Sequence, residues 1–501
     1  MKRISFLMAA LLLAMTGCQK EPQQKVETTE GGEVYMSFSV KAVTKSQTDN
    51  TGYSNSNATP EIEVGKNEEN AISNIQVFLQ NGENTIEATN VTLVGGGVNY
   101  TATFKEELLE AGIPYSIYVI CNETANVVNP NAATVEKEIT GWTGTELNIS
   151  KDNNFLMTNA KTVEPRTITE AELKACMSPA TPLNLGLVEV ERTVARFDYA
   201  QTKEGHLYPI AGNTVQIYLS EAAVINVSKE SYYFRRVAAT ESGENFVVGG
   251  VESPVNYVVD TDWAAKTSLK GGWNNTDADK LFYSPLFNKS TWKWIDLIDL
   301  NTADNVTADI NSKQYNFLSY VSENTIPGTN AQINGLSTGV VFRGYLHNGT
   351  DVITGTKNLY VYANKYYGNW EAVATAALSD DTLLAAYKAV NGSETNLAKC
   401  VEAGFTVYTA VDNKYPVYYY YWNRHNDNLK PGEMGNMEFA VVRNNVYKLA
   451  VTNINQFGHP ELPEGDPDPV TPQTPDEQVR HYFQVTVKVL PWTVRVNDIE
   501  F

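Results

Sequence analysis

Residues that build common catalytic and metal sites are scarce in this chain of 501 residues. The five histidines are scattered without the HxxxH or HExxH spacing of a zinc site. They are His206, His347, His425, His459 and His481. The glycines of Gly95–Gly97 lack the Lys-Ser/Thr of a phosphate-binding loop, so we expect a turn between strands there. The sequence therefore predicts no enzyme, no cofactor and no metal.

Cysteine is also rare. Besides Cys18, the chain has only Cys121, Cys176 and Cys400, an odd number at wide spacing, which excludes a disulfide framework. Cys121 ends an apolar run, and we expect it to be a small core residue.

Positive charge is in short supply. Lys and Arg total 38 against 58 Asp and Glu, which gives a net charge of −20. This balance argues against nucleic acid or an anionic bilayer as a partner. Two acidic loops, Asp277–Asp279 and Asn423–Asp427, could hold calcium, but neither has a known ligand register, so a solvated loop is the favoured interpretation.

A long apolar run is missing too. The run at Ile4–Met15 is too short to span a bilayer. With the residues behind it, it is typical of a lipoprotein signal peptide that is cleaved between Gly17 and Cys18 and acylated, for example with palmitate, on Cys18. The alternative is an ordinary signal peptide with a chance cysteine. We expect residues 1–17 to be the signal and 18–32 a spacer, with the precursor in the outer membrane only through its lipid.

The chain is rich in the alternation of apolar and polar residues that is typical of β-strands. Tyrosine alone occurs 28 times, and helical periodicity is infrequent. The first such segment, Glu33–Val43, places Val34, Met36, Phe38 and Val40 on one face. An all-β fold with a few short helices is therefore expected. Further strands are predicted at Ile75–Leu79, Asn99–Phe104, Tyr115–Cys121, Leu185–Tyr199, Thr214–Leu219, Gly339–Tyr345, Asn358–Tyr362, Tyr415–Trp422 and Val441–Val451.

Helix signals are found in three places. Thr169 and Glu172 have the spacing of a capping box, and Ser379–Val390 combines a serine cap with early acids. A third short helix is expected at Lys105–Ala111, ending at Gly112.

The run Tyr418–Tyr421 could form a sugar-stacking surface, because aromatic rings lie flat on apolar sugar faces. Alternation favours instead two rings in the core and two at the surface.

Two stretches are too polar or too rich in proline to pack. Residues 44–70 predict a long exposed loop that a protease could cut. Residues 462–477 are acidic and contain several prolines, so we expect an extended tether.

The last segment, residues 478–501, alternates again, with an interruption at Pro491. Its apolar face consists of Phe483, Val485, Val487, Val489, Trp492, Val494 and Val496. Burial of seven such side chains contributes about 10–20 kcal/mol, whereas ordering some twenty residues costs roughly 1–2 kcal/mol for each backbone. Since the two terms nearly cancel, the strand needs a groove with ladder partners, in its own chain or in a neighbour.

Several motifs, taken in order, resemble the type V pilins, or fimbrillins, and most closely the structural subunit of the minor fimbrium. They are the lipoprotein signal, the first strand, the exposed loop, Phe155–Thr158, Val190–Arg196, Val442–Tyr447 and Val487–Val494. The resemblance extends to Phe501, with little in the middle of the chain.

This resemblance implies two tandem transthyretin-like β-sandwich domains, at 33–185 and 186–461, plus a C-terminal donor strand. It also implies strand exchange: a protease removes the first strand, here 33–43, and the emptied groove accepts the donor strand 478–501 of the next subunit. The implied partners are other copies of the chain, accessory fimbrial subunits, a maturation protease, and ligands on host or bacterial surfaces.

The cut site departs from the family pattern. The family's protease is specific for arginine, but no arginine lies between Arg3 and Arg166. The nearest equivalent is the bond from Lys45 to Ser46, with Lys41 and Lys66 as alternatives. Either a trypsin-like protease that accepts lysine cuts here, or this subunit keeps its strand and works as an anchor.

The sequence thus predicts a structural subunit of a fimbrial shaft, located in the fimbrium at the cell surface, that supports adhesion. The runner-up is a fimbrial anchor, or a tip or accessory adhesin lipoprotein that binds glycans or other cells. In that case the C-terminal strand would close its own sandwich.

Overall fold

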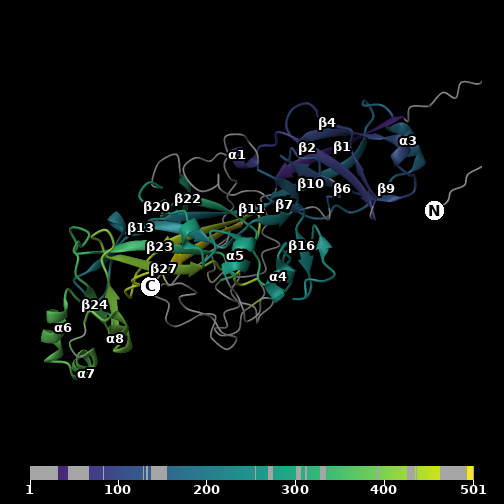
Figure 1. Cartoon of the computed structure of the whole chain (residues 1–501). Coiled ribbons are helices and arrows are strands. Elements are labelled where there is room, and N and C mark those ends of the chain that lie inside the picture. Colours follow the sequence, from purple (N-terminus) through teal and green to yellow (C-terminus); the bar gives the residue numbers. More distant parts are fainter. Residues whose placement is uncertain are drawn as a thin grey trace, which may run out of the picture.

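The structure is a computed structural model. It describes residues 32–42, 67–82, 84–127, 129–130, 134–136, 155–253, 255–268, 275–300, 306–310, 313–327, 335–390, 392, 394–425, 435, 437–462 and 493–499. These residues form an elongated molecule with a sheet-rich N-terminal end and a helical lobe at the opposite end (Figure 1). The predicted all-β class with a few short helices is confirmed.

The N-terminal sheet has nine strands and closes around one apolar core. Its order is β3-β2-β6-β8-β10-β1-β5-β4, and β9 pairs with β6. The strands are β1 (Glu33–Ala42), β2 (Ile75–Asn81), β3 (Asn84–Glu87), β4 (Asn90–Leu93), β5 (Asn99–Lys105), β6 (Pro114–Cys121), β8 (Met157–Asn159), β9 (Arg166–Thr167) and β10 (Leu183–Arg192). The short helices of this part are α1 (Asn67–Asn70), η2 (Glu106–Leu108) and α3 (Glu170–Ala175).

The C-terminal part is a sandwich of two five-stranded sheets. One contains β21 (Val306–Ile310), β22 (Lys313–Ser322), β11 (Val194–Ala200), β28 (Asn445–Val451) and β30 (Thr493–Ile499), in that order. The other contains β12 (Leu207–Pro209), β13 (Gln216–Ile225), β23 (Gly339–His347) and β27 (Pro416–Trp422), with β20 (Ile295–Asp296) beside β13.

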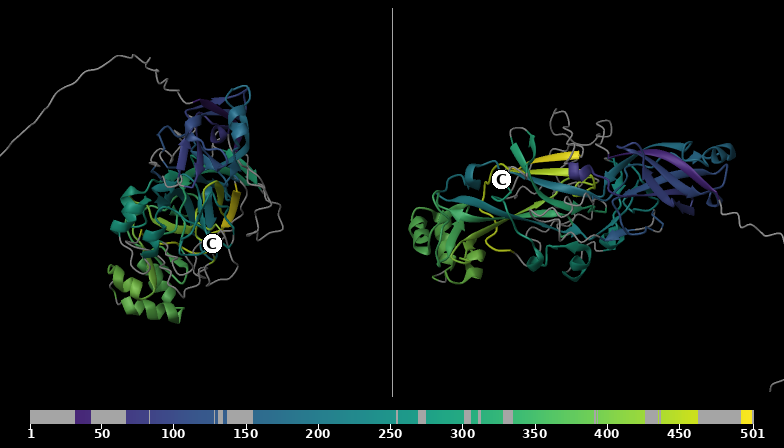
Figure 2. Two further views of the ribbon diagram at one scale, coloured as in Figure 1. Left: turned by 90° about the vertical axis from the view of Figure 1, so that its right-hand side faces the viewer. Right: turned by 90° about the horizontal axis from the view of Figure 1, so that it is seen from above.

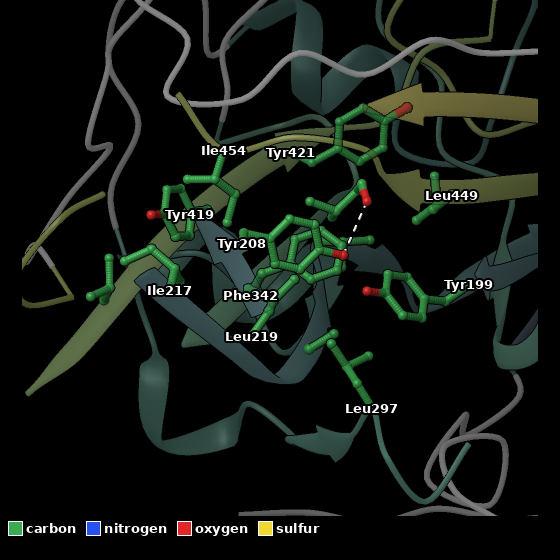
Figure 3. Close-up of a cluster of buried hydrophobic side chains, with 14 of the residues drawn as sticks. Tyr199, Tyr208, Ile217, Leu219, Leu297, Phe342, Tyr419, Tyr421, Leu449 and Ile454 are labelled. Atoms are coloured by element: carbon green, nitrogen blue, oxygen red, sulfur yellow. Dashed lines mark hydrogen bonds between the residues drawn. The ribbon is translucent and has the colours of Figure 1, made fainter. Parts of the chain in front are cut away.

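The inward faces of these two sheets meet in an aromatic core (Figure 3). Tyr199 and Leu449 come from the first sheet, and Phe342 and Tyr419 from the second. The buried Tyr208 hydroxyl donates to the carbonyl of Val451 at 3.0 Å, so its polar atom is satisfied inside the core.

Smaller elements surround the sandwich. The two-stranded sheets pair β14 (Val227–Ser228) with β19 (Phe282–Tyr283) and β15 (Glu230–Tyr232) with β7 (Thr134–Glu136). The three-stranded sheets are β17 (Val247–Val248), β16 (Arg236–Ala238) and β18 (Tyr257–Val258), and β25 (Lys365–Tyr367), β24 (Leu359–Tyr362) and β26 (Phe405–Tyr408). The helices are η4 (Glu204–His206), α4 (Trp263–Ser268), α5 (Asn275–Leu281), η5 (Lys289–Thr291), α6 (Trp370–Ala377), α7 (Asp381–Val390) and α8 (Leu397–Glu402).

The predicted strand Leu185–Tyr199 proves to be two strands, β10 and β11, separated by Thr193. β10 pairs within the N-terminal sheet, and β11 opens the C-terminal sandwich. The core-facing positions shift by one residue across the break, from Val188 and Val190 in β10 to Phe197 and Tyr199 in β11, and all of β11 is buried. This shift of phase is the sign of the change of sheet that the sequence offers.

Local signals predicted the helices unevenly. The capping box of α3 is confirmed, since the Thr169 hydroxyl accepts from the Glu172 amide. Helix α7 is confirmed as well, but its cap is Asp380, whose Oδ1 accepts from two amides at 3.0 Å. The third helix is only the single 3-10 turn η2.

The two parts of the molecule are joined by buried charges. Glu69 in α1 is 1 % exposed, and its carboxylate accepts from Arg196 Nη1 and from the Tyr320 hydroxyl, both at 2.6 Å. Arg192 Nε donates to the Glu69 carbonyl at 2.8 Å. Burial alone would raise the pKa of Glu69, but the two arginines outweigh it and the pKa is lowered.

Asp198 continues this ion cluster into the sandwich. It accepts two bonds from Arg196 at 3.0 Å and one from Lys448 Nζ at 2.7 Å. Burial opposes ionisation here as well, yet the two cations lower the pKa of Asp198. Breaking one member of such a buried cluster leaves charge without compensation.

We expect Glu69→Ala to lower the free energy of unfolding by about 3–5 kcal/mol, because Arg196 loses a buried partner. Denaturant unfolding measures the change. The exposed Glu110→Ala serves as control and should stay within about 0.5 kcal/mol of the parent. Equal stability of the two variants would contradict a role for Glu69 in joining the two parts.

Candidate functional site

The strand that the sequence singles out first, β1, lies inside the N-terminal sheet with a partner on each side. It runs parallel to β10, with Met36 opposite Leu183 and Val40 opposite Val188. On its other side it runs antiparallel to β5, with Phe38 opposite Tyr100. A central strand of this kind has its ladder bonds satisfied on both edges.

The inward face of β1 is fully buried. Val34, Met36, Phe38 and Val40 are between 0 and 2 % exposed and belong to the core of the N-terminal sheet. The Phe38 ring stacks on Tyr100, with ring centroids 5.7 Å apart. The structure thus brings together the four side chains that alternation predicted for one face.

Removal of β1 would leave a defined groove. Its walls would be the facing edges of β10 and β5, each with unpaired backbone groups. Its floor would be apolar, because Val77, Ala102 and Val119 of the same core are completely buried. Such a groove accepts an extended segment that carries apolar residues at alternate positions.

The predicted processing residues fall mostly outside the described ranges. Lys41 is exposed near the end of β1, opposite Glu189 of β10. Gly17, Cys18, Lys45, Ser46 and Lys66 lie outside the described residues.

Part of the predicted donor segment is described. Val494 and Val496 lie in β30, which pairs parallel with β28 of the same chain, opposite Val446 and Lys448 (Figure 2). The predicted donor residues Phe483, Val485, Val487, Val489 and Trp492 lie outside the described residues. In this uncut chain, therefore, β1 occupies the N-terminal groove and β30 covers the edge of β28.

The sequence motifs at 190–196 and 442–447 have a structural role that their residue types alone did not reveal. Arg192, Arg196 and Arg443 are at most 1 % exposed. Arg443 forms an ion pair with Glu323 at 2.9 Å, and Arg192 Nη1 donates to Asn444 at 3.0 Å. Arginines within or directly before strongly alternating strands were the available signal, because such positions are normally apolar.

A serine motif was missed in the sequence. Residues 335–339 read Gly-Leu-Ser-Thr-Gly, which matches the G-x-S-x-G pattern of a nucleophile elbow. Ser337 is completely buried, and the motif leads into strand β23 and not into a helix. Both features differ from an exposed catalytic serine.

The tyrosine run follows the alternation. Tyr419 and Tyr421 belong to the sandwich core, while the rings of Tyr418 and Tyr420 lie near Trp294 and Trp292 on the other face. Tyr418 is only 9 % exposed, so this face is covered and offers no open stacking platform there.

Within the described residues, no three His, Cys, Asp or Glu side chains gather closely enough to hold a metal ion. The same residues contain no helix with the length and apolar character needed to cross a membrane. Cys121, Cys176 and Cys400 are buried free thiols.

Comparisons with known proteins relate this architecture to fimbriae. The model of the major fimbrial subunit protein FimA matches residues 34–185. The model of the C-terminal region of fimbrillin, described as a type IV major fimbrial subunit protein, matches residues 413–498. No curated protein matches the sequence.

Several solved structures are similar over most of the chain. A candidate cell adhesion protein from Parabacteroides distasonis is 14 % identical, covers 90 % of this chain and 99 % of its own, and gives a TM-score of 0.37. One from Bacteroides eggerthii is 10 % identical, covers 94 % and 97 %, and gives the same TM-score of 0.37. At these TM-scores the likeness carries no argument about function.

One family model covers the strands that form the β1 groove, and the other covers β28 and most of β30. Their descriptions name major fimbrial subunits, so the finer likeness to the minor fimbrium stays a prediction. Proteins of these families are structural, which confirms that the chain is not an enzyme. The resemblance to the fimbrillins, structural subunits of cell-surface fimbriae, is thus confirmed over residues 34–185 and 413–498.

Proposed function

We propose that this chain is a shaft subunit that polymerises by strand exchange. The observation that carries the proposal is the position of β1, which lies centrally in its sheet and yet precedes a polar stretch, residues 44–66, that contains Lys45. A cut there separates β1 from the rest of the chain. Because Glu69 stays fixed by the arginines, the remainder of the N-terminal part is retained.

The tail matches the strand that it would replace. Val34, Met36, Phe38 and Val40 recur every second residue, and Phe483, Val485, Val487 and Val489 have the same spacing. A groove that fits the apolar face of β1 therefore also fits the apolar face of the tail, because both faces repeat every second residue. Each side chain buried in this way contributes about 1.5–3 kcal/mol.

The direction of β30 favours exchange between molecules. Its start lies opposite Asn445, next to the Asn444 that contacts Arg192 at the junction, and its end lies opposite Val451. The chain therefore runs away from its own N-terminal sheet, toward the end with the helical lobe (Figure 1).

Export as a lipoprotein completes the proposal. Cleavage between Gly17 and Cys18 would leave a lipid on Cys18 that holds the precursor in the outer membrane. The later cut after Lys45 would then free the subunit for the fimbrium. The partners would be other copies, accessory subunits and the maturation protease.

The domain division is also proposed. The change of sheet at Thr193 supports a boundary there, inside the family motif and beyond the expected position at 185. The transthyretin-like topology of each domain remains part of the same proposal.

A second candidate is a fimbrial anchor, or a tip subunit that does not donate its strand. The pairing of β30 with β28 of the same chain favours this role, because a tail that is paired within its own subunit is not available to a neighbouring one. The absence of arginine from the region between Arg3 and Arg166 points in the same direction. N-terminal sequencing of the protein from cells separates the two, since an anchor keeps β1.

Polymerisation tests the proposed shaft role. Protein cut after Lys45 should form fibres visible by electron microscopy, and protein without residues 478–501 should not. Val487→Asp should also prevent fibres, because a carboxylate would have to enter the apolar groove. Lys488→Ala, on the opposite face of the same segment, is the matched control and should polymerise normally. Equal fibre yield with and without the tail would refute strand exchange.

The free energy that keeps β1 bound in its groove can be tested separately. Phe38→Ala should weaken the seating of β1 by about 3–5 kcal/mol, because it removes a buried ring and leaves a cavity. The measurement is the release of the β1 peptide after proteolysis, followed by chromatography. Ser37→Ala alters the opposite face and should release the peptide at nearly the parent rate. Identical release from both variants would contradict a groove held by its apolar floor.

A further inference from the structure

A lysine is completely buried among oxygen atoms beside the C-terminal sandwich. Lys266 in α4 is 0 % exposed, and its Nζ donates to Asn324 Oδ1 at 2.7 Å and to the Thr325 carbonyl at 2.9 Å. Asp260 Oδ2 is in contact with the same atom, and Asp262 Oδ1 lies 2.6 Å from it. This cluster is separate from the charged residues Glu69, Arg196 and Asp198 at the junction.

The carboxamide of Asn324 is held in one orientation. Its Nδ2 donates to the carbonyls of Asn226 and Leu336 and to the Thr338 hydroxyl, at 2.8 to 3.1 Å. The carbonyl oxygen therefore faces Lys266. Because a C=O bond is about 1.2 Å long, the amine lies within about 4 Å of the carbonyl carbon Cγ, close to the separation of reacting atoms in a near-attack geometry.

The surroundings exclude water. Asn324 is 1 % exposed and Asp260 2 %, and the Phe282 ring centroid lies 5.9 Å from Lys266 Nζ. Asn324 is also fixed through its backbone, which exchanges hydrogen bonds of 2.9 and 2.7 Å with Val441. The amine and the carboxamide are therefore held together by two rigid segments in a dry site.

The two carboxyl groups make proton transfer possible. Burial and the neighbouring Asp262 raise the pKa of Asp260, so that one of the pair holds a proton readily. Burial alone would lower the pKa of Lys266, but the two carboxylates outweigh it and raise its pKa. The raised pKa keeps Lys266 charged at rest, so a neutral amine forms only when its proton passes to a neighbouring carboxylate, which also removes a buried ion pair.

From this geometry we propose that Lys266 and Asn324 form an intramolecular isopeptide bond, with Asp260 and Asp262 as the acid and base that move the protons. The inference is independent of strand exchange and concerns a covalent modification within one subunit.

The reaction balances without a cofactor. Lys266 Nζ, after losing a proton to Asp262, attacks Cγ of Asn324, and the carbonyl electron pair moves to Oδ1 beside the protonated carboxyl. As the tetrahedral carbon collapses, a carboxyl group of the pair gives a proton to Nδ2, and the carboxylate so formed takes the second proton from Nζ. One Nζ–Cγ bond forms, the Cγ–Nδ2 bond breaks, ammonia leaves, and nothing is oxidised or reduced.

Asn324 is the preferred electrophile over Asp260, which also touches the amine. A carboxamide cannot ionise, whereas a carboxyl group repels a nucleophile whenever it is ionised. A bond to Asp260 would also consume the acid and would join residues only six apart in the sequence. A bond to Asn324 links α4 to the end of β22, which would stiffen a subunit that carries load along a fibre.

Peptide mapping by tandem mass spectrometry of the purified full chain tests the bond. The peptide with Lys266 should be joined to the peptide with Asn324, at the sum of the two peptide masses less one ammonia. Asp260→Asn should abolish the link, whereas the exposed Asp279→Asn should retain it. Lys266→Arg, which keeps the charge, should lack the link in folded protein.

Separate, unmodified peptides from the folded parent chain would overturn the proposal. So would a link from Lys266 to Asp260, which releases water and not ammonia. Because the parent chain alone decides between these outcomes, a variant that fails to fold does not affect the test. Failure here would leave the proposed shaft function unchanged, since that depends on β1 and the tail.

Discussion

The hydrogen-bond ladder around β1 is the constraint on which the rest of this molecule depends. A strand at the centre of a sheet satisfies donors and acceptors on two neighbours and covers an apolar core at the same time. Here those neighbours are β10 and β5, and the core includes Phe38 and Met36. Loss of such a strand would leave unpaired backbone groups on two neighbours and an uncovered apolar floor, and a segment of the same alternation could cover both. The proposed function follows from this requirement together with the second alternating strand at the far end of the chain.

The buried charge cluster at the junction explains how one strand could leave while the remainder stays in place. Glu69 lies only a few residues after the region of the expected cut, and Arg196 and Arg192 fix it to the start of the sandwich. Buried ion pairs add little net stability compared with apolar packing, but they are costly to break singly. They therefore suit a junction that must keep one geometry in every copy of a fibre.

The sequence revealed those features that depend on local pattern. The alternation of Val34 to Val40 identified a strand with one buried face, and the spacing of Thr169 and Glu172 identified the capping box of α3. It did not reveal features that depend on residues distant in the chain. The change of sheet at Thr193 depends on the distant strands with which β10 and β11 pair, and the burial of Glu69 depends on arginines more than a hundred residues away. The sequence did not reveal the pairing of β30 with β28 either, because neither strand's own sequence indicates its parallel partner.

The central claim is that the place of β1 is taken by the tail of another copy in the assembled fimbrium. A cryo-electron microscopy map of the native fibre tests it most directly, because side chains can be assigned in the groove between β10 and β5. The account predicts residues 483–489 of a neighbouring subunit in that groove. Density for Glu33–Ala42 of the same subunit would contradict it.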